Sequence, residues 1–322
     1  MHKYTSVSSY LLNSFKLLTP LVLLASCAGI RPIEKKNLDG VKKESDTQTT
    51  QVNEKKVEAP KSFDLYKGTV RPGEVSLLRV KGPFMKNGVL TCDTEKVNYF
   101  LRGHELWAFV SETYFSDLKP FDCYYKDSKG SPVKIAEFNV LEKSFPAERL
   151  KVDKKRVFLS KKDSLRAAKE RKIRSKAYNS SPATPYFFGP FELPIKSLVT
   201  SIYGSKRVFN NKKQTQHLGT DYRAGVGTPI KTANRGKVAI SRHFFYTGNT
   251  VIIDHGMGIF TTYGHLSKLL VSEGEIIPEG TIIGHAGATG RVTGPHLHWG
   301  VTVNKLAVEG DSLVEASQAL GE

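Results

Sequence analysis

The sequence predicts a mostly β protein with two β domains joined by a helix. Short runs rich in β-branched and aromatic residues recur along the chain, Gly, Pro and Asn-Gly pairs separate them, and one segment has a clear helix start. With 322 residues, of which 39% are hydrophobic, the chain is long enough and apolar enough for two packed domains. We divide it into segments 1–26, 27–61, 62–147, 148–184 and 185–315.

The first 26 residues have the pattern of a secretory signal. Two lysines precede a short apolar run over residues 17–24, which is too short to cross a membrane as a helix. The run ends in Leu24-Ala25-Ser26-Cys27, which resembles the bacterial lipobox. That resemblance implies cleavage before Cys27, lipidation of its thiol and attachment to a membrane; an ordinary signal peptide that contains a cysteine is the alternative. Ala28 is not the aspartate of inner-membrane retention, so the resemblance favours the outer membrane, facing the periplasm.

Residues 27–61 are predicted to be a disordered tether, because they are polar, hold few large apolar side chains and show no periodicity. The whole chain carries 48 Lys and Arg against 31 Asp and Glu, a net charge of +17. Such a charge favours polyanionic surroundings. Export argues against nucleic acid as the partner, which leaves anionic lipid and the cell wall.

Residues 62–147 are predicted to form a small β-sandwich of immunoglobulin-like size. Strand-like runs such as 75–80 and 106–110 alternate with turns such as Asn87-Gly88. His104 stands alone among these residues, so we expect no catalytic role for this domain.

Cys92 and Cys123 are the two cysteines that remain after Cys27. In an oxidising compartment they would form one disulfide, and two buried free thiols are the alternative. A closed loop of roughly 30 residues would stabilise the domain by about 3–4 kcal/mol.

Residues 148–184 are predicted to be a basic helical linker. Ser160-Lys161-Lys162-Asp163 resembles a capping box, and the helix that it opens extends to about residue 178. Residues 151–176 contain twelve Lys and Arg against three acids. The apolar stripe is thin, with Leu165, Ala168 and Ile173, so we expect a polar helix on the next domain. Its basic charge is either a solvated face or a contact with anionic wall or lipid headgroups.

Residues 185–315 are predicted to form an antiparallel β domain with little helix, because strand-like runs recur there and glycines separate nearly all of them. In the run from His296 to Val303, His296 and His298 are two positions apart, so both imidazoles point to one face of a strand. Upstream, His217 and Asp221 are four apart, with Gly219 between them arguing against a helix. Zinc hydrolases hold their metal with three such donors and leave one position for water.

Three motifs in a fixed order identify the family that this domain resembles. They are His217-x-x-x-Asp221, Tyr263-Gly264-His265-Leu266-Ser267 and the segment Thr289–Gly300, which contains Gly294-Pro295-His296-Leu297-His298-Trp299-Gly300. Together with Ile202–Arg207, Gly225–Pro229 and Asp254–Gly256, they are similar to the lysostaphin-type (LytM-like) zinc endopeptidases over about residues 185–310. The family's closing Asn-Pro or Asp-Pro pair is missing at residues 308–312, which leaves the C-terminal boundary open.

The resemblance implies one Zn²⁺ per chain, bound by His217, Asp221 and His298. It also implies that His265 and His296 are catalytic histidines that do not bind the metal. The expected substrate is the peptide stems of peptidoglycan. No glutamate base occurs in the motifs, so a histidine is the available general base. We expect His255 and His285 to be structural.

Three functions are compatible with these observations. The first is a lipid-anchored zinc endopeptidase that hydrolyses the peptide cross-links of peptidoglycan. The alternative is a catalytically silent LytM-like regulator that activates another wall hydrolase, although such proteins typically lose metal ligands. Cleavage of a protein substrate is the third. The sequence leaves open which bond is cut, and it indicates no protein regulator.

Overall fold

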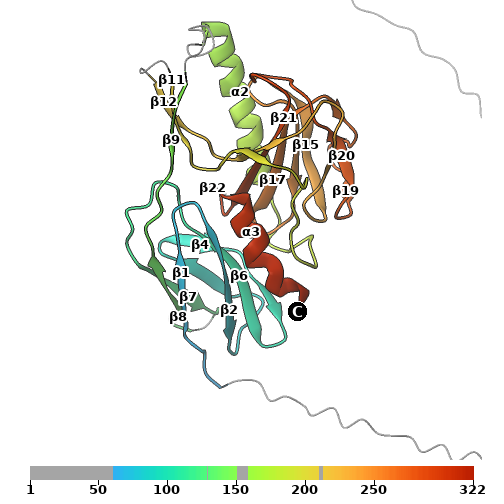
Figure 1. Cartoon of the computed structure of the whole chain (residues 1–322). Helices are drawn as coiled ribbons and strands as arrows, with labels where there is room; N and C mark the ends of the chain where they lie inside the picture. The colour runs from blue at the N-terminus through green and yellow to red at the C-terminus, as the bar shows by residue number, and fades with distance from the viewer. Residues whose placement is uncertain (1–60, 129, 151–158, 210–212) are drawn as a thin grey trace, which may run out of the picture. The chain divides into compact units, whose positions relative to one another are not determined.

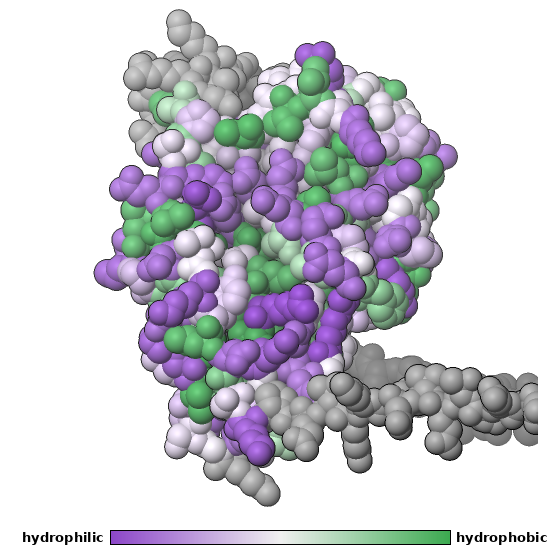
Figure 2. All heavy atoms as spheres, turned by 60° about the horizontal axis from the view of Figure 1, so that its bottom comes forward, coloured by the Kyte–Doolittle hydropathy of each residue, from purple (hydrophilic) through white to green (hydrophobic). Residues whose placement is uncertain are grey.

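The computed structural model describes residues 61–322, apart from 129, 151–158 and 210–212 (Figure 1). These residues form mostly β-structure, which confirms the predicted fold class. The predicted signal, Cys27 and nearly all of the predicted tether lie outside the described residues. Within the described part of the chain, none of the helices is both long and apolar enough for a membrane span. On the face in Figure 2, hydrophobic side chains are scattered among hydrophilic ones, as is ordinary for a folded surface.

The N-terminal domain consists of two β-sheets that pack around one core. The first sheet has the order β1-β8-β7-β3-β4 and the second β2-β6-β5, with β1 parallel to β8. Their bounds are β1 Tyr66–Val70, β2 Val75–Lys81, β3 Val89–Cys92, β4 Glu95–Val97, β5 Phe100–Arg102, β6 Glu105–Ser111, β7 Phe121–Lys126 and β8 Val133–Val140. Leu78 and Leu106 of the second sheet and Leu90 and Phe138 of the first are fully buried in this core.

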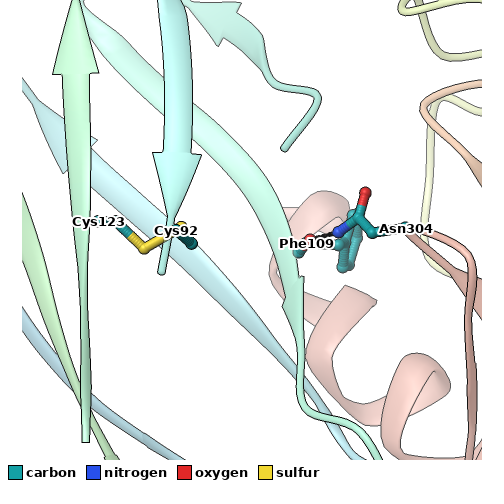
Figure 3. The surroundings of a disulfide bond; sticks show 4 residues. All are labelled: Cys92, Phe109, Cys123 and Asn304. Atoms are coloured by element: carbon teal, nitrogen blue, oxygen red, sulfur yellow. Dashed lines mark hydrogen bonds between the residues drawn. A yellow bond between two sulfur atoms is a disulfide. The ribbon is translucent and has the colours of Figure 1, made fainter. Parts of the chain in front are cut away.

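A disulfide joins Cys92 of β3 to Cys123 of β7 (Figure 3). The two residues lie directly opposite each other in the antiparallel pair of strands. Both are buried in the core of the sandwich. The bond therefore links two residues that are 31 positions apart in the sequence. It stabilises the domain by restricting the conformations of the unfolded chain.

The C-terminal domain is built on an eight-stranded sheet in which every neighbouring pair is antiparallel. Its order is β10-β13-β21-β17-β16-β15-β19, and β22 pairs with β21. The bounds are β10 Val199–Ser201, β13 Thr220–Arg223, β15 Gly236–Phe244, β16 Gly248–Asp254, β17 Ile259–Leu266, β19 Ile276–Ile277, β21 His296–Val303 and β22 Leu306–Val308. A small sheet β14-β20-β18 lies beside it, from Pro229–Lys231, Ile282–His285 and Lys268–Leu269.

The two faces of the large sheet bury different sets of residues. Alternate residues of β21, namely Leu297, Trp299, Val301 and Val303, belong to the main core on one face. His296 and His298 therefore point to the opposite face. That second face also carries the small cluster of Ile240, Phe244, Ile252 and Phe260.

Helix α2 (Lys161–Tyr178) packs on this second face, and Ser160 caps it by accepting a hydrogen bond from the Asp163 amide at 3.1 Å. The predicted stripe is wrong in part, because Leu165 is 58% exposed and Ile173 is 36% exposed. Ala167 is buried instead, and the ring of Tyr178 lies 4.8 Å from that of Phe260. The helix therefore contacts the sheet through a different side from the predicted stripe, with Ala167 and Tyr178.

Two elements were not predicted. Segment Ala147–Leu150 forms β9, which pairs in parallel with β11 (Lys206–Phe209), and β11 pairs with β12 (Lys213–Gln216). The linker predicted to begin at 148 therefore begins with a strand. At the other end, helix α3 (Gly310–Ser317) and a 3₁₀ turn (Gln318–Gly321) continue past the predicted boundary at 315.

The sandwich and the large sheet of the C-terminal domain share a hydrophobic core. Val75, Trp107 and Phe109 of the sandwich belong to the same buried cluster as Trp299 of β21. The side-chain amide of Asn304 donates to the Phe109 carbonyl at 2.8 Å (Figure 3). The two domains are therefore packed against each other through a shared core.

His255 is a buried histidine that should make folding sensitive to acid. Its Nδ1 donates to the Arg235 carbonyl at 2.9 Å, its Nε2 lies 2.7 Å from the Thr261 hydroxyl, and burial lowers its pKa to about 4. The unfolded chain takes up this proton near pH 6.5, so the stabilisation is present above that pH and is lost as the pH falls toward 4. The loss is at most about 3 kcal/mol.

We expect the free energy of unfolding of the metal-free protein, measured in urea, to fall between pH 6.5 and 4.5. H255N should reduce the pH dependence of the free energy of unfolding, whereas H104N at an exposed turn should leave that dependence unchanged. An H255N protein with the full slope of the wild type would contradict this assignment.

Candidate metal centre

Strand register brings the three predicted metal ligands together. Asp221 of β13 lies directly opposite His298 of β21, and Gly264 of β17 flanks His298 on its other side. His217 follows β12 and is buried beside them. Gly219 is needed between His217 and Asp221, because a Cβ there would lie 2.5 Å from His298 Cε1.

The donor atoms of this set converge on one point. His217 Nε2 and His298 Nδ1 lie 3.1 Å and 2.8 Å from Asp221 Oδ1, and 3.1 Å from each other. A tetrahedral zinc ion with bonds of about 2.0–2.2 Å spaces its donors by about 3.3–3.6 Å, so modest outward shifts of the side chains would admit it. Among the described residues, His217, Asp221 and His298 form a group of His, Cys or acidic side chains whose donor atoms are close enough together to hold a metal ion. The set fits a single zinc ion.

The surrounding hydrogen bonds orient the ligands. The backbone carbonyl of Ile202 lies 3.2 Å from His217 Nδ1, so this nitrogen carries the proton and Nε2 offers its lone pair. Burial alone would raise the pKa of Asp221, but its hydrogen bonds with His217 and His298 hold that pKa well below its ordinary value. The carboxylate is therefore ionised and ready to bind a cation.

Arg207 holds the second oxygen of the Asp221 carboxylate. Its Nη2 donates to Asp221 Oδ2 at 3.1 Å and to the Ser201 hydroxyl at 2.8 Å. One carboxylate oxygen thus faces the histidines and the other faces the guanidinium. Arg207 lies in a motif that predicted the family, yet its role was missed, because only the position of β11 shows that it reaches Asp221.

His265 and His296 stand beside the metal-ligand set, with their ring centroids 4.8 Å apart. His296 Nδ1 donates to the Gly294 carbonyl at 3.0 Å, and His265 Nδ1 donates to the Thr289 carbonyl at 2.8 Å. Each Nε2 is therefore available to accept a proton, and that of His296 lies 3.7 Å from Asp221 Oδ1.

Burial lowers the pKa of His265 to about 4, with the neighbouring His298 adding to the effect, so it is neutral at pH 7. His265 also adopts a φ of +61°, unusual for a residue with a side chain, and its amide donates to the Thr247 carbonyl. This backbone turns its ring toward His296. Among the other predicted residues, His255 lies in the core and His285 in β20, so neither joins the site.

Comparison with known proteins shows what the segment that holds this site is similar to. Residues 215–310 match the model of Peptidase family M23, which confirms the resemblance drawn from the motifs. The peptidoglycan DD-endopeptidase ShyA of Vibrio cholerae serotype O1 is 40% identical over 117 residues, which are 36% of this chain and 27% of ShyA. ShyC of the same organism is 50% identical over 88 residues, 27% of this chain and 20% of ShyC. The chain thus spans about a quarter of these curated relatives.

A crystal structure from Pseudomonas aeruginosa that bears the name of peptidase M23 is similar over both domains. Its TM-score is 0.60 at 27% identity, and the alignment covers 76% of this chain and 95% of that chain. That share extends well beyond residues 215–310, so the shared fold includes the N-terminal β domain.

Replacing Arg207 by Met should weaken zinc binding, because the Asp221 carboxylate loses the partner that orients it. We expect a dissociation constant about tenfold higher, measured by competition with a chromophoric chelator. K206M, the exposed neighbour on β11, is the matched control and should bind zinc like the wild type. Equal affinities for R207M and K206M would show that the guanidinium does not position the ligand.

Proposed function

We propose that this chain, whose residues 215–310 are a Peptidase family M23 domain, is a zinc endopeptidase that hydrolyses peptide cross-links of peptidoglycan. The observation that carries the proposal is the complete site. His217, Asp221 and His298 converge on one point, and two further imidazoles with free Nε2 atoms stand beside it. The names of the relatives ShyA and ShyC support the choice of substrate, since both are called peptidoglycan DD-endopeptidases.

The residues of this chain divide the chemistry among them. Zinc held by His217, Asp221 and His298 would supply a Lewis acid that acidifies water and polarises the peptide carbonyl. His296 would take the proton from the attacking water at Nε2, because its Nδ1–H is held by the Gly294 carbonyl. His296 would then hand this proton to the leaving amine. The neutral His265, whose Nδ1–H is held by the Thr289 carbonyl, would accept a hydrogen bond from the attacking water at its unprotonated Nε2 and so orient it.

A silent regulator is the second candidate, and the geometry argues against it. Such a protein has no need of three convergent donors or of two imidazoles with fixed tautomers. Here the donor atoms lie within 4.8 Å of one another, and backbone carbonyls fix both histidines. We therefore place catalysis first.

We further propose that the protein is exported and anchored to a membrane by a lipid on Cys27, in the outer membrane facing the periplasm. The support is the sequence Leu24-Ala25-Ser26-Cys27 with Ala28 after it. A polar segment from 27 to 61 would let the enzyme reach the wall. Its reach as a flexible chain is about 30–35 Å.

Two alanine variants should separate metal binding from turnover. We expect H298A to lose zinc, and H296A to keep one zinc per chain while its turnover falls by about 100-fold or more. Zinc is measured by elemental mass spectrometry, and turnover by mass analysis of the muropeptides released from purified sacculi.

H104A, on an exposed turn of the sandwich, is the control and should keep both zinc and activity. Equal loss of metal in H296A and H298A would refute the division of roles. A zinc-loaded wild type that leaves sacculi intact would refute the proposed activity itself.

A further inference from the structure

Helix α2 carries lysines on one side only. Lys161, Lys162, Lys169, Lys172 and Lys176 are all exposed and fall within one stripe of the helix, about 100° wide. We call this stripe the lysine face. The opposite side contacts the sheet through the buried Ala167 and through Tyr178, which packs on Phe260.

Both acidic residues of α2 have partners other than the lysines of the lysine face. Glu170 accepts a hydrogen bond from the Phe245 amide at 2.8 Å and pairs with Arg166. Asp163 accepts from the Ser160 hydroxyl at the start of the helix. In the described part of the chain, no carboxylate lies within salt-bridge distance of the five lysines. The lysine face is therefore an uncompensated positive surface on a helix that is fixed in place.

The charge arrangement is unfavourable for the helix alone. Lys172 has like-charged neighbours one turn away on both sides, Lys169 and Lys176. Lys161 and Lys162 lie in the first turn, where the helix dipole disfavours positive charge. Anionic groups along the lysine face would relieve both effects.

The lysine face and the metal centre lie on the same side of the large sheet. Phe260, under Tyr178, precedes Gly264 by four residues on β17, and Gly264 pairs with His298. That spacing is about 13 Å. At the other end of the sheet, Phe245 contacts Arg166 and Glu170, and the nearby Thr247 carbonyl accepts from the His265 amide. The helix thus runs alongside the site.

We propose that the lysine face binds the carboxylate-bearing cell-wall polymer whose cross-links the metal centre cuts, and so holds the enzyme on its substrate. The inference rests on the proposed function for the identity of the polymer. An extended anionic chain can cross the site and continue along α2. A flat anionic bilayer fits less well, because the metal centre lies on the same side of the sheet, where a membrane would compete with the substrate.

The test compares two triple variants of the full chain that remove the same charge. K169Q/K172Q/K176Q removes three positive charges from the lysine face, with a substitution that preserves helix propensity. K81Q/K96Q/K126Q removes three from exposed positions of the sandwich. Four quantities are measured: co-sedimentation with purified sacculi at low and high salt, binding to vesicles containing anionic phospholipid, hydrolysis of sacculi, and hydrolysis of a soluble cross-linked muropeptide dimer.

We expect the α2 variant to bind sacculi about tenfold more weakly at low salt, and to hydrolyse them correspondingly more slowly. Its rate on the soluble dimer should stay within about twofold of the wild type, because the metal centre is untouched. The sandwich variant should match the wild type in all four measurements.

Equal losses in both triple variants would overturn the proposal, because binding would then depend on net charge alone. It would also be overturned if the α2 variant kept sacculus binding and lost binding to vesicles containing anionic phospholipid. If the wild type cut neither sacculi nor the dimer, yet bound sacculi through the α2 lysines, the proposed activity would fail and this inference would stand.

Discussion

Backbone hydrogen bonds between β13 and β21 hold Asp221 opposite His298, and the other residues of the metal centre are placed relative to that pair. Side chains alternate between the faces of a strand, so a slip of one residue would turn Asp221 or His298 into the core. The register is protected because Leu297 and Trp299, on the other face of β21, are buried in the main cluster. Core packing therefore fixes the geometry of the site.

Aromatic residues from the N-terminal domain pack against the loop that leads to the first metal ligand. Tyr114 and Phe145 pack with Tyr203 around Gly204, whose φ is +82° and where a Cβ would meet the Phe145 ring at 2.0 Å. The Gly204 amide donates to the carbonyl of His217, and the His217 amide donates to the Ser205 carbonyl. The loop that carries the first metal ligand is thus held between two domains. None of the five described residues of the site comes from the sandwich, yet the sandwich contributes to the rigidity that a metal site requires.

Alternation of apolar and polar residues predicted most of the strands, because it is a property of neighbouring residues. The five residues of the site came from the resemblance of three motifs to a known family. The parts that were missed depend on contacts between distant segments. β9 forms because the edge of β11 is available to it, and the Lys206 amide donates to the Pro146 carbonyl. Helix α3 is placed by packing: Leu313 is buried, and Gly310 lies against the Trp299 ring. Arg207 could be read as part of a motif, but its contact with Asp221 requires the position of β11.

The parallel pairing of β9 with β11 has a consequence for the modularity of this protein. The residues that define the family begin at 215, but the strand that carries Arg207 is completed by residues that follow directly on the sandwich. A fragment that began at 185 would retain every metal ligand and still leave β11 with an open edge, which invites pairing with other chains. The folding unit is therefore larger than the segment 215–310 that matches the family model. Any rearrangement that joined the C-terminal domain to other domains would have to carry β9 along or replace it.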